Sequence, residues 1–144
     1  MLYLDPSLVV SLVTAEAHTA EAQDWLEDQD SSELAISDWV VTEVVSALSI
    51  KQRTGQIDDV TRARASRAFD DLARDAFSVL PVPRTGFAAA AAMAGRPELV
   101  LRSGDALHLA TVDHHGARLC TRDARQAEAG NRLGLDVFLL GDSA

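Results

Sequence analysis

Short apolar runs alternate with longer, partly polar stretches along this chain, and the two kinds of segment predict different elements. Apolar residues in the longer stretches recur every three to four positions, which is typical of helices with one buried face. We predict strands over Leu2–Leu4, Leu34–Ser37, Phe77–Val82, Ala117–Thr121 and Val137–Leu140. Helices are predicted over Ser7–Val13, Thr19–Glu27, Asp58–Asp75, Thr85–Ala94 and Asp123–Leu133, with two more that begin near Asp38 and Ser103. This alternation predicts an α/β fold of three layers, in which helices flank a central parallel sheet of four to five strands.

Capping residues and helix breakers mark where several of these elements begin and end. Asp38 is predicted to cap the long third helix, and Gly55 to stop it. Ser103 is predicted to cap the helix that runs through His115. Pro81 has no N–H to donate to a neighbouring strand, so we expect its strand at an edge of the sheet.

Length and composition narrow the class of protein. The 144 residues are enough for one domain, which we expect to span residues 1–144. No apolar run reaches the roughly 18 residues that cross a bilayer, and the N-terminus lacks the pattern of a secretory signal, so we expect no membrane association. The single cysteine, Cys120, excludes an internal disulfide and favours a reducing compartment, so a cytoplasmic protein with a buried structural thiol is expected.

The net charge of −9 argues against nucleic-acid binding through a broad basic surface, because phosphate binding is mainly electrostatic. That argument weakens if several acids are gathered in one pocket and neutralised by a divalent cation. All the basic residues except Lys51 are arginines, which can bind phosphate in a bidentate way. Arg62, Arg64, Arg67 and Arg74 share one predicted helix, which we interpret as a salt-bridged surface, with contact to a substrate or partner as the alternative.

Four acids follow strand ends or begin helices: Asp5, Glu43, Asp105 and Asp123. Asp5 and Asp123 come directly after apolar strands, and the carboxyl ends of parallel strands share one edge of the sheet. Glu43 and Asp105 fall in the first turns of helices. The helix dipole stabilises an acid in a first turn by roughly 0.3–1 kcal/mol, which could account for each position taken alone. Taken together, we expect the four side chains to project into one crevice.

Such a gathering of carboxylates requires a counter-ion. Two like charges about 4 Å apart repel by about 4 kcal/mol at an effective dielectric near 20. Carboxylate oxygens, without a histidine pair or cysteine cluster beside them, favour Mg²⁺ or Mn²⁺ over zinc. Such an ion can polarise a phosphoryl oxygen and activate a bound water, so hydrolysis of a phosphodiester is the natural match.

Four stretches of the chain carry a resemblance to a known family. They are Leu4–Ser7, Thr42–Leu48, the Asp-Ala-Leu-His-Leu-Ala-Thr run Asp105–Thr111, and Thr121–Asp123. In this order and at these intervals they resemble the PIN-domain ribonucleases, and among these the VapC-type toxins of bacterial type II toxin–antitoxin systems. The run from Asp105 followed by Thr-x-Asp is fairly specific, whereas an aspartate after a first strand is not.

The resemblance implies a PIN-like fold and an Mg²⁺- or Mn²⁺-dependent endoribonuclease that hydrolyses RNA. Asp5 and Asp105 would be direct metal ligands, Glu43 would bind directly or through water, and Asp123 would act on a second ion or its waters. Ser7 and Thr121 match hydroxyl positions that support the site. The resemblance also implies a toxin that forms a homodimer and is neutralised by a cognate antitoxin.

Other interpretations of the same residues remain open. A phosphatase with Asp5 as nucleophile would want a second acid two residues later, where this chain has Ser7, and a phospho-accepting receiver would want a lysine near the last strands. A catalytically silent PIN-like module that binds RNA or protein is the non-enzymatic alternative. His108, one turn after Asp105, could serve as a general base, but we interpret it as a packed or hydrogen-bonded side chain.

Overall fold

The central sheet has strand order β3-β2-β1-β4-β5, and every pairing in it is parallel. The computed structural model describes residues 1–141, so the last three residues of the expected domain lie outside it. The strands are β1 (Leu2–Leu4), β2 (Leu34–Ser37), β3 (Ser78–Leu80), β4 (Arg118–Thr121) and β5 (Val137–Leu139). The predicted parallel sheet is confirmed, and the strand followed by Pro81 lies at an edge.

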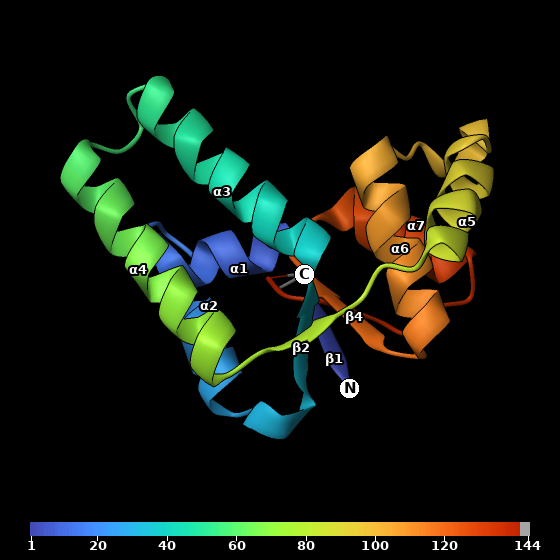
Figure 1. The fold of residues 1–144 in the computed structure, drawn as a ribbon, viewed down its shortest axis with the longest axis horizontal. Coiled ribbons are helices and arrows are strands. Elements are labelled where there is room, and N and C mark those ends of the chain that lie inside the picture. The colour runs from blue at the N-terminus through green and yellow to red at the C-terminus, as the bar shows by residue number, and fades with distance from the viewer. Residues whose placement is uncertain (142–144) are drawn as a thin grey trace.

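Helices cover both faces of the sheet and complete the predicted three layers. They are α1 (Pro6–Val13), α2 (Thr19–Glu27), α3 (Asp38–Arg53), α4 (Asp59–Asp75), α5 (Arg84–Ala94), α6 (Ser103–His115) and α7 (Ala124–Arg132), with short 3-10 turns at Ser31–Glu33 and Pro97–Leu99. Figure 1 shows α1 to α4 gathered on one side of the strands and α5 to α7 on the other. No described helix combines the length and the apolarity that a membrane crossing requires.

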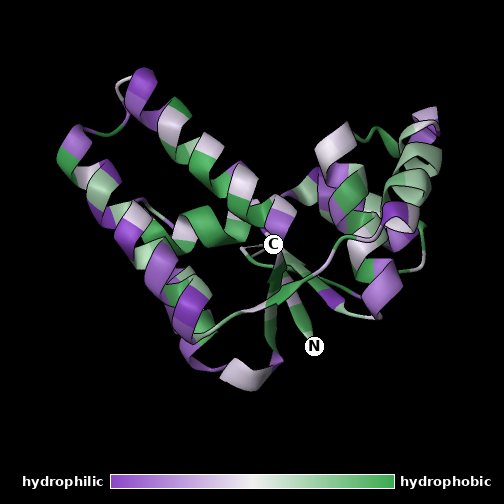
Figure 2. Cartoon of the chain, in the orientation of Figure 1, coloured by the Kyte–Doolittle hydropathy of each residue, from purple (hydrophilic) through white to green (hydrophobic). Residues whose placement is uncertain are grey.

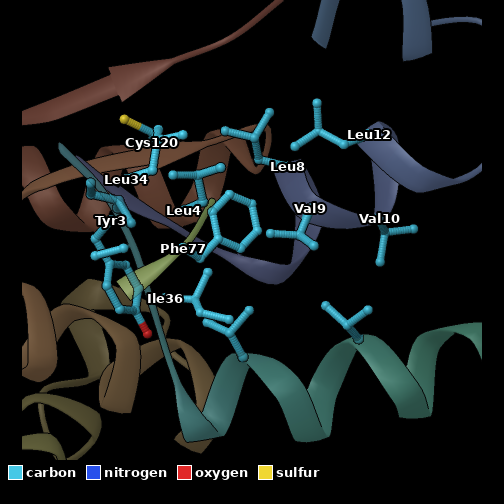
Figure 3. Close-up of a cluster of buried hydrophobic side chains, with 14 of the residues drawn as sticks. Tyr3, Leu4, Leu8, Val9, Val10, Leu12, Leu34, Ile36, Phe77 and Cys120 are labelled. Atoms are coloured by element: carbon cyan, nitrogen blue, oxygen red, sulfur yellow. The ribbon is translucent and has the colours of Figure 1, made fainter. Parts of the chain in front are cut away.

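Most of the core lies between β1, β2 and the helices α1 and α3. Figure 3 shows Leu4, Leu8, Val9 and Ile36 packed together there. Every residue from Leu8 to Leu12 is buried, so α1 is buried on all sides, as expected of a helix enclosed by others. In Figure 2, by contrast, α4 alternates between hydrophobic and hydrophilic residues, as expected of an outer helix.

A second, smaller core joins α5 to α6 through Ala90, Ala106, Leu107 and Ala110. The small side chains let the two helices approach closely. Through α6, this packing places Asp105 and His108 beside the carboxyl end of the sheet.

Two predicted helix caps are wrong by one residue. Ser37 caps α3, because its hydroxyl accepts the Val40 N–H, and Asp38 is the first helical residue. Arg102 precedes α6, and Ser103 is already helical. At the other end of α3, Gly55 follows the last turn with φ +77°, a conformation that favours glycine.

Helix α4, which carries four of the arginines, largely forms the salt-bridged surface that the sequence predicts. The Arg74 guanidinium pairs with Asp71 at 2.8 Å and with Asp75 at 2.9 Å. Arg62 donates a hydrogen bond to Gln52 on α3 at 2.6 Å.

Candidate functional site

Asp5 lies where β1 ends and α1 begins, and only 1% of its surface is exposed. Pro6 follows it at the first helical position, where a missing N–H costs nothing, so Asp5 becomes the N-cap of α1. Its Oδ1 atom accepts hydrogen bonds from the Ser7 hydroxyl at 2.7 Å and from the Leu8 N–H at 3.1 Å. The carboxylate is therefore oriented by residues next to it in the chain.

Thr121 ties Asp5 to the neighbouring strand. Leu4 pairs with Cys120 across β1 and β4, so Thr121, the next residue of β4, reaches Asp5 and donates its hydroxyl to Oδ2. Thr121 Oγ1 also accepts the Asp123 N–H at 2.9 Å, and Asp123 itself caps α7. The expected convergence of these two strand ends is thus observed. We call Asp5, Ser7, Thr121 and Asp123 the hydroxyl cluster.

Glu43 is held by a different arrangement, which begins inside the core. Its Oε2 atom lies 2.8 Å from His108 Nε2, and His108 Nδ1 lies 2.7 Å from the Tyr3 hydroxyl. The Tyr3 oxygen in turn lies 2.8 Å from Ser37 Oγ. Figure 3 shows the Tyr3 hydroxyl pointing out of the apolar cluster. We call Ser37, Tyr3, His108 and Glu43 the histidine relay; it confirms that His108 is packed and hydrogen-bonded.

Glu43 also lies against the first turn of α6. A Cβ atom added to Gly104 would collide with Glu43 Oε1, so the carboxylate needs a glycine at that position. Asp105, the next residue, is half-buried. Glu43, Asp105 and Arg102 all line one hollow of about 490 Å³ between α3 and α6, which also reaches Pro6 and Trp39.

Burial and repulsion between carboxylates raise the pKa of acids in this region. Burial raises the pKa of the Asp5 carboxyl, and the hydrogen bonds from Thr121, Ser7 and Leu8 only partly oppose that rise. The pKa of Asp105 is also raised, first by burial and then by the nearby charge of Asp123. Among residues 1–141 no ion pair involves Asp5, Asp105 or Asp123, so no cationic side chain of that part of the chain is in direct contact with these carboxylates.

The donor set suits a hard divalent cation in its chemistry, although it is not a closed cage. The groups are carboxylate oxygens, which Mg²⁺ and Mn²⁺ prefer. Within the described part of the chain, however, no three histidine, cysteine or acidic side chains lie close enough together to hold one ion. Mg²⁺ commonly keeps several waters and takes only one or two protein carboxylates, so an open set of this kind fits it.

The family of the chain follows from comparison with known proteins. Residues 2–131 match the model of the PIN domain. The chain belongs to the PIN-domain family. It is 33% identical to "Ribonuclease VapC35" from Mycobacterium tuberculosis over 99% of both chains, which confirms the resemblance to VapC-type PIN domains.

Solved PIN-like structures confirm the fold class. FitAcB from Neisseria gonorrhoeae superimposes with a TM-score of 0.70 at 16% identity and covers 96% of each chain. VapC20 from Mycobacterium tuberculosis, described as a toxin that cleaves the sarcin–ricin loop, gives 0.71 at 18% identity over 90% of this chain and 95% of its own. VapBC2 from Rickettsia felis, solved with a DNA fragment from its promoter, gives 0.68 at 16% identity over 97% and 99%.

The four candidate acids were chosen from the sequence, but several residues that contact them were not. Asp5 and Asp123 share the hydroxyl cluster, and Asp105 lies close enough for the charge of Asp123 to raise its pKa. Glu43 is bonded to His108 and lines one hollow with Asp105, whereas Asp5 and Asp123 do not line that hollow. Tyr3, Ser37 and Gly104 were missed. The apolar setting of Tyr3 indicated burial only, and nothing in the sequence indicated which groups its hydroxyl would contact.

Proposed function

We propose that this protein is a VapC-type endoribonuclease toxin that hydrolyses RNA phosphodiester bonds with Mg²⁺ or Mn²⁺ and is neutralised by a cognate antitoxin. One observation carries the proposal most. In a chain 33% identical over its length to a ribonuclease, Thr121 joins Asp5 to the Asp123 backbone at one edge of the sheet, and Asp105 lies close enough for the charge of Asp123 to raise its pKa.

The four acids have distinct proposed roles. Asp5 and Asp105 would bind the ion directly, because one is rigidly oriented and the other lines the open hollow. Glu43 would hold it directly or through water, and Asp123 would act on a second ion or its waters. When bound, a hard dication supplies charge for the phosphoryl oxygen and the leaving oxygen and lowers the pKa of a bound water. No side chain is proposed as a nucleophile.

Ser7 and Thr121 would orient the Asp5 carboxylate without binding the ion themselves. Both hydroxyls donate to Asp5, so one carboxylate oxygen faces each of them and the carboxylate plane is fixed. Carboxylate oxygens have further lone pairs, which leaves Asp5 able to bind an ion while it keeps these hydrogen bonds. Groups that orient metal ligands in this way commonly matter about 10–100-fold for metal affinity or activity.

The proposed partners follow from the relatives. One similar structure, from Klebsiella pneumoniae, is described as a toxin–antitoxin complex. We propose that this chain likewise forms a homodimer, binds a small antitoxin and acts on RNA in the cytoplasm. Its net charge of −9 would attract a basic antitoxin segment.

Removal and replacement of the metal tests the chemistry. EDTA should abolish cleavage of a defined RNA by the purified chain, and Mn²⁺ added in excess should restore it. Asp105→Asn should abolish cleavage, whereas Asp113→Asn should not, because Asp113 is exposed near the other end of the same helix. Cleavage that persists in EDTA, or in Asp105→Asn, would contradict the mechanism.

A silent RNA- or protein-binding module is the second candidate, and it is favoured by the absence, among residues 1–141, of three acids close enough to hold one ion. A gel assay separates the two functions. A module would retard RNA without shortening it, whereas the proposed nuclease releases fragments in a metal-dependent way. Sequencing the ends of those fragments would then identify the RNA that is cut.

A further inference from the structure

We propose that Tyr3 and His108 are positioning residues, which hold the Glu43 carboxylate at the first turn of α6 beside Asp105. The proposal rests on the function proposed above for its effect on catalysis, but the hydrogen-bond geometry that it describes can be tested without any RNA or metal.

The hydrogen bonds of the relay have a definite direction. An ionised Glu43 carboxylate only accepts hydrogen bonds, so the His108 nitrogen 2.8 Å from it, Nε2, must carry a hydrogen. In the neutral imidazole, Nδ1 then accepts the Tyr3 hydroxyl hydrogen at 2.7 Å. The Tyr3 oxygen accepts in turn from Ser37, whose own oxygen accepts the Val40 N–H. Each donor therefore has one acceptor. The chain of hydrogen bonds begins at the first turn of α3, passes through the buried Tyr3 and His108, and returns to Glu43 on the same helix.

Burial makes the inner part of the relay rigid and leaves its outer end free. Tyr3 and Ser37 are fully buried and His108 is 1% exposed, whereas 32% of the Glu43 side chain is exposed. A glutamate side chain has several rotatable bonds, and at such an exposure packing alone does not select one rotamer. His108 supplies the fixed donor that does so.

Gly104 limits the carboxylate from the opposite side. Oε2 is bound by His108, and Oε1 lies against Gly104, where no Cβ atom blocks it. His108 stands one helical turn after Asp105, so both project from the same face of α6. The relay therefore fixes Glu43 relative to Asp105, with which it shares the hollow.

Nitrogen NMR of the metal-free protein tests the geometry. With ¹⁵N-labelled histidine at neutral pH, wild-type His108 should show a single tautomer with hydrogen on Nε2 and an accepting Nδ1. Tyr3→Phe removes the hydroxyl that donates to Nδ1 and should shift the ¹⁵N resonance of Nδ1 toward the value of a ring nitrogen that accepts no hydrogen bond. A hydrogen on Nδ1, or a spectrum that Tyr3→Phe leaves unchanged, would overturn the proposal.

Kinetics test the consequence for catalysis. His108→Leu should lower kcat about 10–100-fold with little change in KM. His108→Gln, which can still offer an N–H toward Glu43, should recover part of that loss. Thr111→Val is the matched control, because Thr111 is a buried polar residue of α6 whose hydroxyl donates to the Leu107 carbonyl within the helix. The kcat of this variant should stay near wild type.

The outcomes separate this proposal from the proposed function. If the wild-type chain cuts no RNA, the function fails while the NMR result still decides the relay. If His108→Leu does not fold, Tyr3→Phe replaces it, since it keeps the ring and should lower kcat with KM unchanged. Wild-type kcat in Tyr3→Phe and in a folded His108→Leu would overturn the positioning role even if the nuclease activity is confirmed.

Discussion

Asp5 in the hydroxyl cluster and Glu43 in the histidine relay stand at the same edge of the sheet, but they are held in different ways. Asp5 is buried and accepts from three donors, two of them its neighbours in the chain. Glu43 is partly exposed and accepts one bond, from a residue 65 positions away. Loss of one donor should therefore disturb Asp5 mainly through the cost of an unpaired buried group, and Glu43 mainly through lost orientation.

Because of this difference, we expect stability and activity to respond differently at Asp5 and at Glu43. A buried donor or acceptor left without its partner costs about 1–3 kcal/mol. A partly exposed carboxylate can bind water instead, so its displacement costs little stability. Loss of a donor to Asp5 should then change both the free energy of unfolding and catalysis, whereas displacement of the Glu43 carboxylate should change catalysis almost alone.

The largest expected effect is that of Asp5→Asn. RNA cleavage should fall by more than about 100-fold, beyond the range typical of supporting groups, because a metal-binding oxygen and its charge are lost. Stability should be unchanged or higher, since asparagine caps a helix as well as aspartate does and the buried charge is removed. Cleavage assays and urea unfolding measure the two effects. Asp38→Asn, at an exposed acid in the first turn of α3, is the control and should match wild type in cleavage.

Thr121→Val should come next and should affect both properties. It removes the donor to Asp5 Oδ2 and the acceptor of the Asp123 N–H without changing the side-chain shape. We expect unfolding free energy to fall by about 1–3 kcal/mol and cleavage by about 10–100-fold. Urea unfolding and Mn²⁺ titration of the activity measure these changes. Full activity with lowered stability would show that the hydroxyl supports the fold but not the metal site.

Gly104→Ala tests how the position of the Glu43 carboxylate affects cleavage and stability. The new Cβ would displace the Glu43 carboxylate, so cleavage should fall by about 10-fold, at the lower end of the range for supporting groups. Unfolding free energy should change by less than about 1 kcal/mol, because alanine favours the helix by about that amount and offsets the crowding. Gly86→Ala in α5, where the new Cβ meets only ordinary contacts at 3.6 Å, is the matched control and should retain full cleavage. Equal activity of the two variants would contradict the proposed role of Glu43.

The same contrast explains how far the sequence could predict the site. The hydroxyl cluster could be predicted, because each of its acids follows an apolar strand and the supporting hydroxyls lie within two residues of an acid. The relay could not, because Tyr3 and His108 are 105 positions apart and only the packing of α6 against the sheet brings them together. His108 lies in a continuous buried run, Ala106–Val112, so the sequence indicated its burial but not its partners. The choice between Ser37 and Asp38 as the cap also depends on backbone geometry that two adjacent capping residues leave open.

The smallest predicted effect concerns pH and isolates the burial of Asp5. Burial raises the pKa of its carboxyl in the folded state, so between the ordinary and the raised pKa the folded protein keeps a proton that the unfolded chain has lost. The free energy of unfolding of the metal-free protein should therefore fall as pH rises through that window and level off above it. Asp5→Asn lacks this contribution, while Asp105, whose pKa is also raised, remains in both proteins. In urea unfolding from about pH 4 to about pH 8, the stability of wild type relative to Asp5→Asn should decline with rising pH. A difference in unfolding free energy that does not change with pH would mean that water reaches the Asp5 carboxylate in solution. Asp5 and Glu43 would then differ less in solvation than their burial indicates.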